Sequence, residues 1–331
     1  MGIKRILKNI YKGFIKSSKI QKVFYVLAIV YIISLFKDYS ITEGFANDSG
    51  SANNSSGTIG INTTNKFTLI EGPAIYDKFY ANIYDELVFS KMKDDFEVGE
   101  IINSTHPTTE SRILDIGSGT GHHVSNFTTN GLQAVGVDIS PAMVNKAKEN
   151  YPALEFKQGD VLDTMIFAGN SFTHISCLYF TIYYIKNKRQ LFENCIHWLK
   201  PGGYLALHLV DREHFDPILP AGDPFGIVSP QKYAKERITT TLVKFNGFEY
   251  KSNFEADTEQ EGTEEVNASL QETFKNKKDG KVRKNKHNFY MATQTTILSI
   301  AKSVGFILTA KIDMVKCQYS NQYIYIMQKP T

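Results

Sequence analysis

Three acidic residues near the ends of short apolar stretches could bind a polar ligand, and a glycine-rich turn follows the first of them. Asp115 lies in ILDIGSGTGHHV (113–124), Asp138 ends the stretch VGVD, and Asp160 follows QG. The glycines of the turn are Gly117, Gly119 and Gly121. Carboxylates accept hydrogen bonds from hydroxyl and amino groups, and glycine lets the backbone approach a ligand closely. The pattern therefore indicates a site for a nucleotide-like ligand.

The elements that must position these residues alternate between strand-like and helix-like stretches. The expected parallel strands are 113–116, 134–137, 154–158, 173–178 and 204–210. The expected helices are 122–129, 141–150 after a Ser140 cap, 188–199 and 293–304, and two more strand-like runs cover 306–314 and 322–327. This alternation predicts a doubly wound, mostly parallel sheet, in which ligands bind at the carboxyl ends of the strands.

The spacing of the glycines separates two classes of cofactor. A dinucleotide fingerprint, G-x-G-x-x-G, would have its third glycine at position 122, which is His122 here. The arrangement D-x-G-x-G-x-G, with acids after the next two strands, resembles the class I S-adenosylmethionine-dependent methyltransferases. The resemblance covers about residues 70–331 and includes SFTHISCLYFTIYYI and LKPGGYLALHLV.

This resemblance implies a seven-stranded α/β sheet whose last two strands form an antiparallel hairpin, and S-adenosyl-L-methionine as cofactor. It implies that Asp115 orients the methionine end of the cofactor and that the three glycines let the backbone lie beside it. Asp138 would accept hydrogen bonds from both ribose hydroxyls. Asp160 would accept one from the adenine amino group, with the backbone N–H of Val161 near the ring. A cap of the following turn is a second interpretation of Asp160.

A tyrosine from an upstream helix often covers the cofactor in such enzymes. The stretch AIYDKFYANIYDELVF offers Tyr76, Tyr80 and Tyr84, of which Tyr76 is our candidate. Packing of an amphipathic helix explains the same spacing. The role of Tyr76 is therefore an expectation.

Methyl transfer from a sulfonium needs alignment and exclusion of water more than it needs a base. The candidate bases are His208 near the end of the fifth strand and Tyr179 after the fourth, with Tyr183 and His287 as further options. His122 and His123 are expected to pack along their helix. No metal site is expected, because the three cysteines are far apart and no His/Cys ligand spacing occurs.

The acceptor is expected to be a small or lipid-like molecule. After the fourth strand the chain reads Leu178-Tyr179-Phe180-Thr181, and not the Asp/Asn-Pro-Pro-aromatic signature of enzymes that methylate nucleic-acid bases or glutamine. Residues 38–331 sum to a net charge of −5, which disfavours nucleic acid. A non-catalytic membrane-bound binding or scaffold protein and a protein methyltransferase remain alternatives. Aminopropyl transfer is disfavoured, since 178–184 contains no acid.

Residues 1–37 form a basic amphipathic segment followed by the uncharged run VFYVLAIVYIISLF, bracketed by Lys22 and Lys37. We expect a single-pass membrane anchor here, with a cleaved signal peptide, a core helix and an organelle-targeting segment as alternatives. Residues 38–66 are rich in Asn, Ser, Thr and Gly and are expected to be a linker. The methyltransferase domain would then be 67–331, with a lid inserted at 211–290 that contains a two-residue hairpin turn at Asp279-Gly280. The side of the membrane and the oligomeric state are left open.

Overall fold

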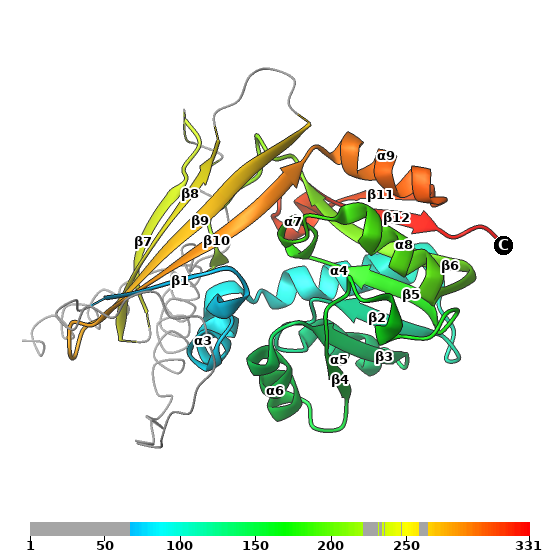
Figure 1. Ribbon diagram of the computed structural model, residues 1–331, viewed down its shortest axis with the longest axis horizontal. Coiled ribbons are helices and arrows are strands. Elements are labelled where there is room, and N and C mark those ends of the chain that lie inside the picture. Colours follow the sequence, from blue (N-terminus) through cyan, green and yellow to red (C-terminus); the bar gives the residue numbers. More distant parts are fainter. Residues whose placement is uncertain (1–66, 221–230, 232–233, 235, 246, 258–263) are drawn as a thin grey trace, which may run out of the picture. The chain divides into compact units, whose positions relative to one another are not determined.

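A seven-stranded sheet carries the glycine loop after its first parallel strand (Figure 1). Its strands are β2 (Arg112–Ile116), β3 (Gln133–Asp138), β4 (Glu155–Gln158), β5 (Phe172–Cys177), β6 (Leu199–Val210), β11 (Ile307–Asp313) and β12 (Gln322–Gln328). The order is β11-β12-β6-β5-β2-β3-β4. The strands from β4 to β6 are parallel, whereas β12 is antiparallel to both β6 and β11. The doubly wound sheet is as predicted, although β6 begins earlier, at Leu199.

The computed structural model describes residues 67–220, 231, 234, 236–245, 247–257 and 264–331. These residues belong to the second of two compact units, Asn62–Thr331. The predicted anchor and linker, 1–66, lie outside the described residues. None of the helices formed by the described residues has the length and apolar content needed to cross a membrane.

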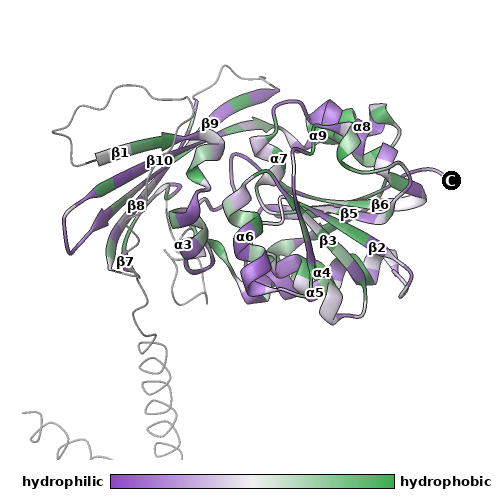
Figure 2. Cartoon of the chain, turned by 60° about the horizontal axis from the view of Figure 1, so that its bottom comes forward, coloured by the Kyte–Doolittle hydropathy of each residue, from purple (hydrophilic) through white to green (hydrophobic). Residues whose placement is uncertain are grey.

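Helices cover both faces of the seven-stranded sheet. They are α4 (Lys91–Thr105) and α5 (His122–Thr129) on one face, and α8 (Lys188–Trp198) and α9 (Gln294–Val304) on the other. Successive side chains of a strand point to opposite faces. Accordingly, Ile113 of β2 packs with Val98 and Phe127, whereas Leu114 packs with Trp198 and Ile297. Figure 2 shows the hydrophobic residues concentrated along the central strands.

Local signals explain the helix that follows β3. Ser140 caps α6 (Pro141–Asn150), because its hydroxyl accepts a hydrogen bond from the N–H of Met143 at 3.1 Å. Pro141 occupies the first turn, where no backbone donor is needed. The helix therefore begins where the sequence predicts it.

The predicted lid forms most of a second, five-stranded sheet. Its strands are β1 (Phe67–Glu71), β7 (Thr240–Phe245), β8 (Phe248–Ala256), β9 (Glu265–Asn276) and β10 (Val282–Ala292), in the order β1-β10-β9-β8-β7. The strand β1, from ahead of the glycine loop, pairs in parallel with β10. The expected two-residue turn is wrong, because the loop between β9 and β10 spans five residues, 277–281.

Tyr76 lies between two short elements and not inside a helix. It follows η1 (Gly72–Ile75) and precedes α3 (Lys78–Val88), which Asp77 caps by accepting from the N–H of Tyr80. Arg283 of β10 donates to Oδ2 of Asp77 at 2.7 Å and to the carbonyl oxygen of Ile75 at 2.9 Å. The second sheet thus fixes the position of Tyr76.

Candidate active site

A cavity of about 480 Å³ lies between the glycine loop and the second sheet, a volume typical of small-molecule sites. The predicted residues that line it are Asp115, Gly117, Gly119, Asp138, Asp160, Val161, Tyr76 and Tyr179. Gly121 and His208 are not among the lining residues. The strand order reverses between β2 and β5, and such a switch point is where doubly wound sheets bind ligands.

The three glycines have different physical roles. All three have positive φ angles, 69° at Gly117, 53° at Gly119 and 94° at Gly121. A Cβ on Gly117 would lie 2.6 Å from the side chain of Thr181, and one on Gly121 would lie 2.7 Å from Phe156. Gly119 has nothing closer than 3.6 Å and faces the open cavity. The protein's own packing therefore requires Gly117 and Gly121, and Gly119 leaves room for a ligand.

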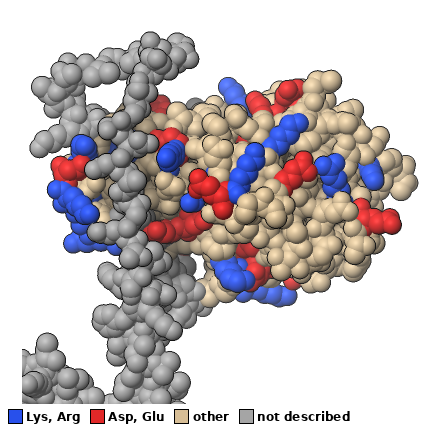
Figure 3. Space-filling model, turned by 90° about the horizontal axis from the view of Figure 1, so that it is seen from below, with Lys and Arg blue, Asp and Glu red and all other residues tan. Residues whose placement is uncertain are grey.

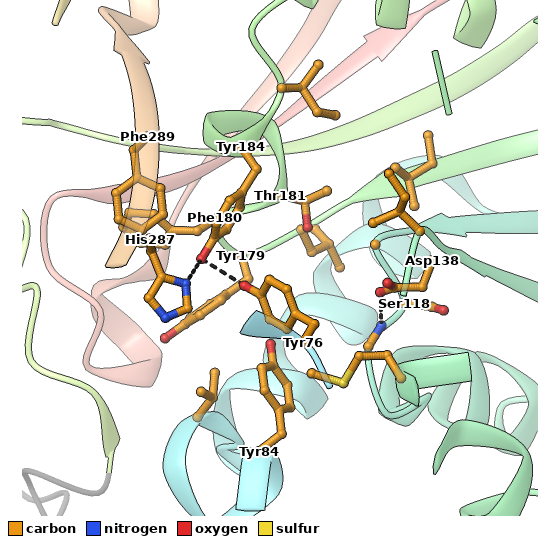
Figure 4. A pocket seen from close by; sticks show the side chains of 18 of the residues that line it. Tyr76, Tyr84, Ser118, Asp138, Tyr179, Phe180, Thr181, Tyr184, His287 and Phe289 are labelled. Atoms are coloured by element: carbon orange, nitrogen blue, oxygen red, sulfur yellow. Dashed lines mark hydrogen bonds between the residues drawn. The ribbon is translucent and has the colours of Figure 1, made fainter. Parts of the chain in front are cut away.

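Asp138 joins the glycine loop to the end of β3. Its Oδ2 accepts from the N–H of Gly119 and its Oδ1 from the N–H of Ser140, both at 2.9 Å. Burial raises the pKa of Asp138, and the two N–H donors oppose this rise. Carboxylate oxygens can each accept more than one hydrogen bond, so Asp138 can still bind ligand hydroxyls from the cavity side (Figure 4).

Asp160 lies exposed at the rim of the cavity, with Val161 beside it. Oδ1 of Asp160 accepts from the N–H of Leu162 at 2.9 Å. This bond closes the turn after β4, which is the second interpretation that the sequence allowed. The structure therefore shows a turn-forming role for Asp160 in addition to its place at the rim.

Asp115 is a buried carboxylate, one oxygen of which, Oδ2, lies 3.9 Å from Nδ1 of His123 but accepts no hydrogen bond from the described residues. Its Oδ1 accepts from the hydroxyl of Ser176 at 2.7 Å. Burial raises the pKa of Asp115 to about 6, although His123 and Ser176 act to lower it. The side chain is thus prepared to receive a positively charged donor from the cavity.

A charged cluster next to Asp115 was not visible in the sequence. Nε2 of His123 lies 2.9 Å from Oε2 of Glu97, and Glu97 also pairs with Lys93. Burial would raise the pKa of Glu97, but Lys93 and His123 lower it to about 2. Burial would lower the pKa of His123, but Glu97, Asp115 and Asp94 raise it to about 9. His123 is therefore a cation held by acids, and it does not simply pack along its helix.

The other histidine of the glycine stretch has a packing role. The ring of His122 stacks on Phe89, with the centroids 3.7 Å apart. Nδ1 of His122 lies 2.7 Å from the hydroxyl of Tyr151. These contacts join α5 to α3 and α6.

The two candidate bases differ in their access to the cavity. Tyr179 lines the cavity with a φ of 53°, and the ammonium of Lys93 lies 4.6 Å from its ring centroid. His208 is fully buried on β6, and burial with the nearby Lys93 lowers its pKa to about 3. Tyr183 is also fully buried and accepts from the N–H of Val210 at 2.8 Å, outside the lining. Neither His208 nor Tyr183 contacts the cavity directly.

The far end of the cavity is aromatic and includes His287, which the sequence suggested as a further base. In Figure 4, Tyr76, Tyr184 and His287 point toward one another, with Phe180 and Phe289 beside them. The hydroxyl of Tyr76 donates to that of Tyr184 at 2.8 Å. Burial raises the pKa of both tyrosines well above its usual value, so they remain protonated.

The described lining of the cavity is predominantly acidic. Its acids are Asp94, Glu97, Asp115, Asp138, Asp160 and Asp216, and its Lys residues are Lys93 and Lys186. On the face shown in Figure 3, acidic and basic side chains are interspersed, and basic ones gather at the end that carries the β9–β10 loop. The cavity thus favours a ligand with positive charge.

Comparisons with known proteins give the class of this domain. Residues 113–203 match a family described as "Methyltransferase domain". This stretch of the chain is similar to a methyltransferase domain. It is 30% identical over 147 residues to dTDP-4-amino-2,3,4,6-tetradeoxy-D-glucose N,N-dimethyltransferase of Saccharopolyspora spinosa, with 42% of this chain and 58% of that protein covered. The chain spans little more than half the length of the curated relatives that it matches.

Solved structures share the fold of the methyltransferase domain at low sequence identity. A S-adenosylmethionine-dependent methyltransferase from Clostridium acetobutylicum has a TM-score of 0.55 at 15% identity, covering 76% of this chain and 98% of that one. SAM-bound CalS10, an amino pentose methyltransferase from Micromonospora echinaspora, has a TM-score of 0.52 at 18% identity, with 76% and 96% covered. The family match over residues 113–203 and the similar curated proteins bear out the predicted methyltransferase domain.

The residues of the cavity fit S-adenosylmethionine. The unused Oδ2 of Asp115 needs a donor, which the α-ammonium group of the methionine end supplies. Asp138 and the open space beside Gly119 suit the ribose. The acidic lining suits a sulfonium cation.

Proposed function

We propose that this protein transfers a methyl group from S-adenosylmethionine to an amine nitrogen of a small molecule. The observation that carries the proposal is one acidic cavity that joins the glycine loop, Asp115 and Asp138 to an aromatic compartment. The named relative is an N,N-dimethyltransferase of an amino sugar, which supports an amine as nucleophile. A positively charged amine also suits the acidic lining.

Some residues of the cavity would bind the cofactor, and others would exclude water from the acceptor. The cofactor supplies an activated methyl group on a sulfonium, so the protein has chiefly to align the nucleophile. Asp115 would hold the methionine end of the cofactor and Asp138 its ribose, beside the glycine loop. Phe180, Tyr184 and Phe289 line the compartment that would receive the acceptor and keep water from it.

The lining also supports a proposal about the acceptor's chemistry. Of the cations in the described lining, Lys93 and His123 are already paired with Glu97, which leaves Lys186. A diphosphate group normally requires several cationic or N–H donors. We therefore infer an acceptor with an apolar body and an amine, and without a nucleotide diphosphate.

The test of cofactor binding is calorimetry with S-adenosylmethionine on the full chain and on Asp138→Ala. The substitution removes two acceptor oxygens from the ribose side, and hydrogen bonds to charged groups contribute about 1.5–3 kcal/mol each, so affinity should fall by about 100-fold or more. Asp163→Ala is the matched control, because Asp163 caps the neighbouring turn outside the lining. Equal binding by Asp138→Ala would contradict the assignment.

We also propose that residues 1–37 tether the protein to a membrane. The support is the basic amphipathic segment and the uncharged run after it. Deleting 1–37 should move the protein from the membrane pellet to the soluble fraction, whereas deleting the linker 38–66 should not. A pellet that is unchanged by the first deletion would contradict the tether.

A further inference from the structure

A continuous chain of hydrogen bonds runs from the acceptor end of the cavity into the second sheet (Figure 4). The hydroxyl of Tyr76 donates to Tyr184 at 2.8 Å, and the hydroxyl of Tyr184 lies 2.9 Å from Nδ1 of His287. Nε2 of His287 lies 2.8 Å from Oε2 of Glu272. Tyr184 is in α7 (Thr181–Tyr184), Glu272 is in β9 and His287 is in β10. Three separate parts of the sequence therefore build one chain.

Glu272 anchors the buried end of this chain as a carboxylate. Its Oε1 accepts from Tyr80 at 3.2 Å and from Tyr250 at 2.9 Å, and its Oε2 accepts from Asn285 at 3.0 Å and from His287. Burial would raise the pKa of Glu272, but His287 and the other donors hold it below its usual value. An ionised carboxylate only accepts hydrogen bonds. Glu272 therefore requires a proton on Nε2 of His287.

This requirement fixes the direction of every other bond in the chain. With Nε2 protonated, Nδ1 of the neutral imidazole is an acceptor, and Tyr184 donates to it. The oxygen of Tyr184 accepts from Tyr76, whose own oxygen is left with lone pairs on the cavity side. All three donors thus point away from the cavity toward Glu272.

We propose that Tyr76, Tyr184, His287 and Glu272 form a proton relay that deprotonates the acceptor amine before methyl transfer. This inference rests on the proposed function, and it deepens it by naming a protonated alkylamine as the substrate class. An alkylammonium group has a pKa of about 10, as lysine does, and has no lone pair for nucleophilic attack at neutral pH. If the aromatic compartment excludes water during the reaction, it has to offer the proton another acceptor.

The step balances without any further reactant. The N–H bond of the ammonium breaks as its proton passes to the oxygen of Tyr76, the proton of Tyr76 passes to Tyr184, and that of Tyr184 forms the Nδ1–H bond of His287. The products are a neutral amine and an imidazolium next to the carboxylate of Glu272. Of the four residues, only Tyr76 would take the proton directly from the substrate, so it is the catalytic residue. The other three act through Tyr76 and are positioning residues.

The groups that face His287 come from three elements and from the segment between η1 and α3. Glu272 from β9 and Tyr184 from α7 contact its two nitrogens, and the hydroxyl of Tyr80 from α3 lies 3.4 Å from Nε2. Tyr76 is the fourth, with its ring centroid 5.9 Å from that of His287. Among these described neighbours Glu272 alone is charged at neutral pH.

The first test determines which nitrogen of His287 carries the proton, and hence the direction of the hydrogen bonds, in the absence of any acceptor molecule. In ¹⁵N NMR of histidine-labelled full chain, with His287→Gln as the assignment control, we expect Nε2 protonated and Nδ1 unprotonated at pH 8. A proton on Nδ1 would mean that His287 donates to Tyr184, and this result would overturn the relay.

The second test uses two isomeric probes, 2-phenylethylamine, which is protonated at neutral pH, and 4-ethylaniline, which is not. Tyr184→Phe interrupts the relay and should slow methylation of 2-phenylethylamine by roughly 10²-fold, the usual scale of general-base catalysis, with little effect on 4-ethylaniline. The rate of Tyr184→Phe with 2-phenylethylamine should also rise tenfold per pH unit up to about pH 10, because without the relay only the free amine reacts. Equal losses with both probes, or no loss, would overturn the relay.

Tyr183→Phe is the matched control, since Tyr183 lies in the same helix but contacts the backbone of Val210 outside the cavity lining. It should keep the wild-type ratio of rates for the two probes. If the wild type binds S-adenosylmethionine yet methylates neither probe, the proposed amine function fails, and the NMR result still decides the order of the hydrogen bonds.

Discussion

Asp115 should make cofactor affinity depend on pH, and the same carboxylate should cost the free protein stability. Its Oδ2 is buried without a hydrogen bond from the described residues, and burial raises its pKa to about 6. An ammonium group binds the carboxylate and not the acid. Affinity for S-adenosylmethionine should therefore increase as the pH rises through about 6.

The size of the effect follows from the fraction of ionised carboxyl. With a pKa of about 6, Asp115 is about 90% ionised at pH 7 and about 10% ionised at pH 5, so the dissociation constant should increase about tenfold between them. Asp115→Asn keeps an oxygen for Ser176 but has no charge. The variant should bind weakly, and its affinity should not change between pH 5 and pH 7.

Stability should change in the opposite sense. The folded state of the wild type holds the Asp115 proton more tightly than the unfolded state does, so the stability that protonation contributes is present at low pH and is lost as the pH rises from about 4 to about 6. Asp115→Asn without cofactor should therefore melt at a higher temperature than the wild type at pH 7.

Calorimetric titrations at pH 5, 6 and 7, together with thermal melts of the cofactor-free proteins, check both statements. Asp163→Ala, which changes an acid outside the lining, should keep the wild-type pH profile. A flat profile in the wild type, or the same slope in Asp115→Asn, would refute the reasoning.

Two further predictions concern packing around the site. Gly117→Ala should lower the free energy of unfolding by about 2–4 kcal/mol, because the position has a φ of 69° and the added Cβ would lie 2.6 Å from Thr181. Adding Thr181→Ala should recover part of this loss. In urea titrations, strictly additive losses would show that the two residues do not clash. Lys93→Met should destabilise the protein by about 3 kcal/mol, since it leaves the buried Glu97 with His123 as its remaining cationic partner in the cluster, and an unchanged urea midpoint would contradict this.

Most of the seven-stranded sheet could be predicted from the sequence because its signals are local. Apolar runs of strand length, the Ser140 cap with Pro141, and the three-and-four-residue spacing of apolar side chains in helices depend on neighbours in the chain. The carboxyl ends of parallel strands meet at one edge, so Asp115 and Asp138 were predicted to share a site. Both line the same cavity.

The second sheet could not be assembled in this way. Its strands alternate in exposure along β9, but β1 pairs with a strand more than two hundred residues later, Phe67 with Val282. From the sequence we interpreted that segment as a lid, because no local signal shows which strand is the partner of another. A two-residue turn at Asp279 and Gly280 was expected for the same reason, but β9 ends at Asn276 and β10 begins at Val282, which leaves five residues in the loop.

Individual side chains show the same contrast between local signals and long-range packing. Lys93 and Glu97 are four residues apart in a helix, a spacing that usually indicates a surface pair, yet both are buried beside His123. His208 was a reasonable base by its place near a strand end, but the face on which it lies is covered.

The sequence by itself determined the class of cofactor, since a glycine turn and acids at strand ends are set by short-range backbone geometry. The tertiary structure decided which groups face the acceptor. Tyr76, Tyr184, Glu272 and His287 are far apart in the chain, and only the packing of the second sheet against the first brings their hydroxyl, imidazole and carboxylate groups within hydrogen-bonding distance.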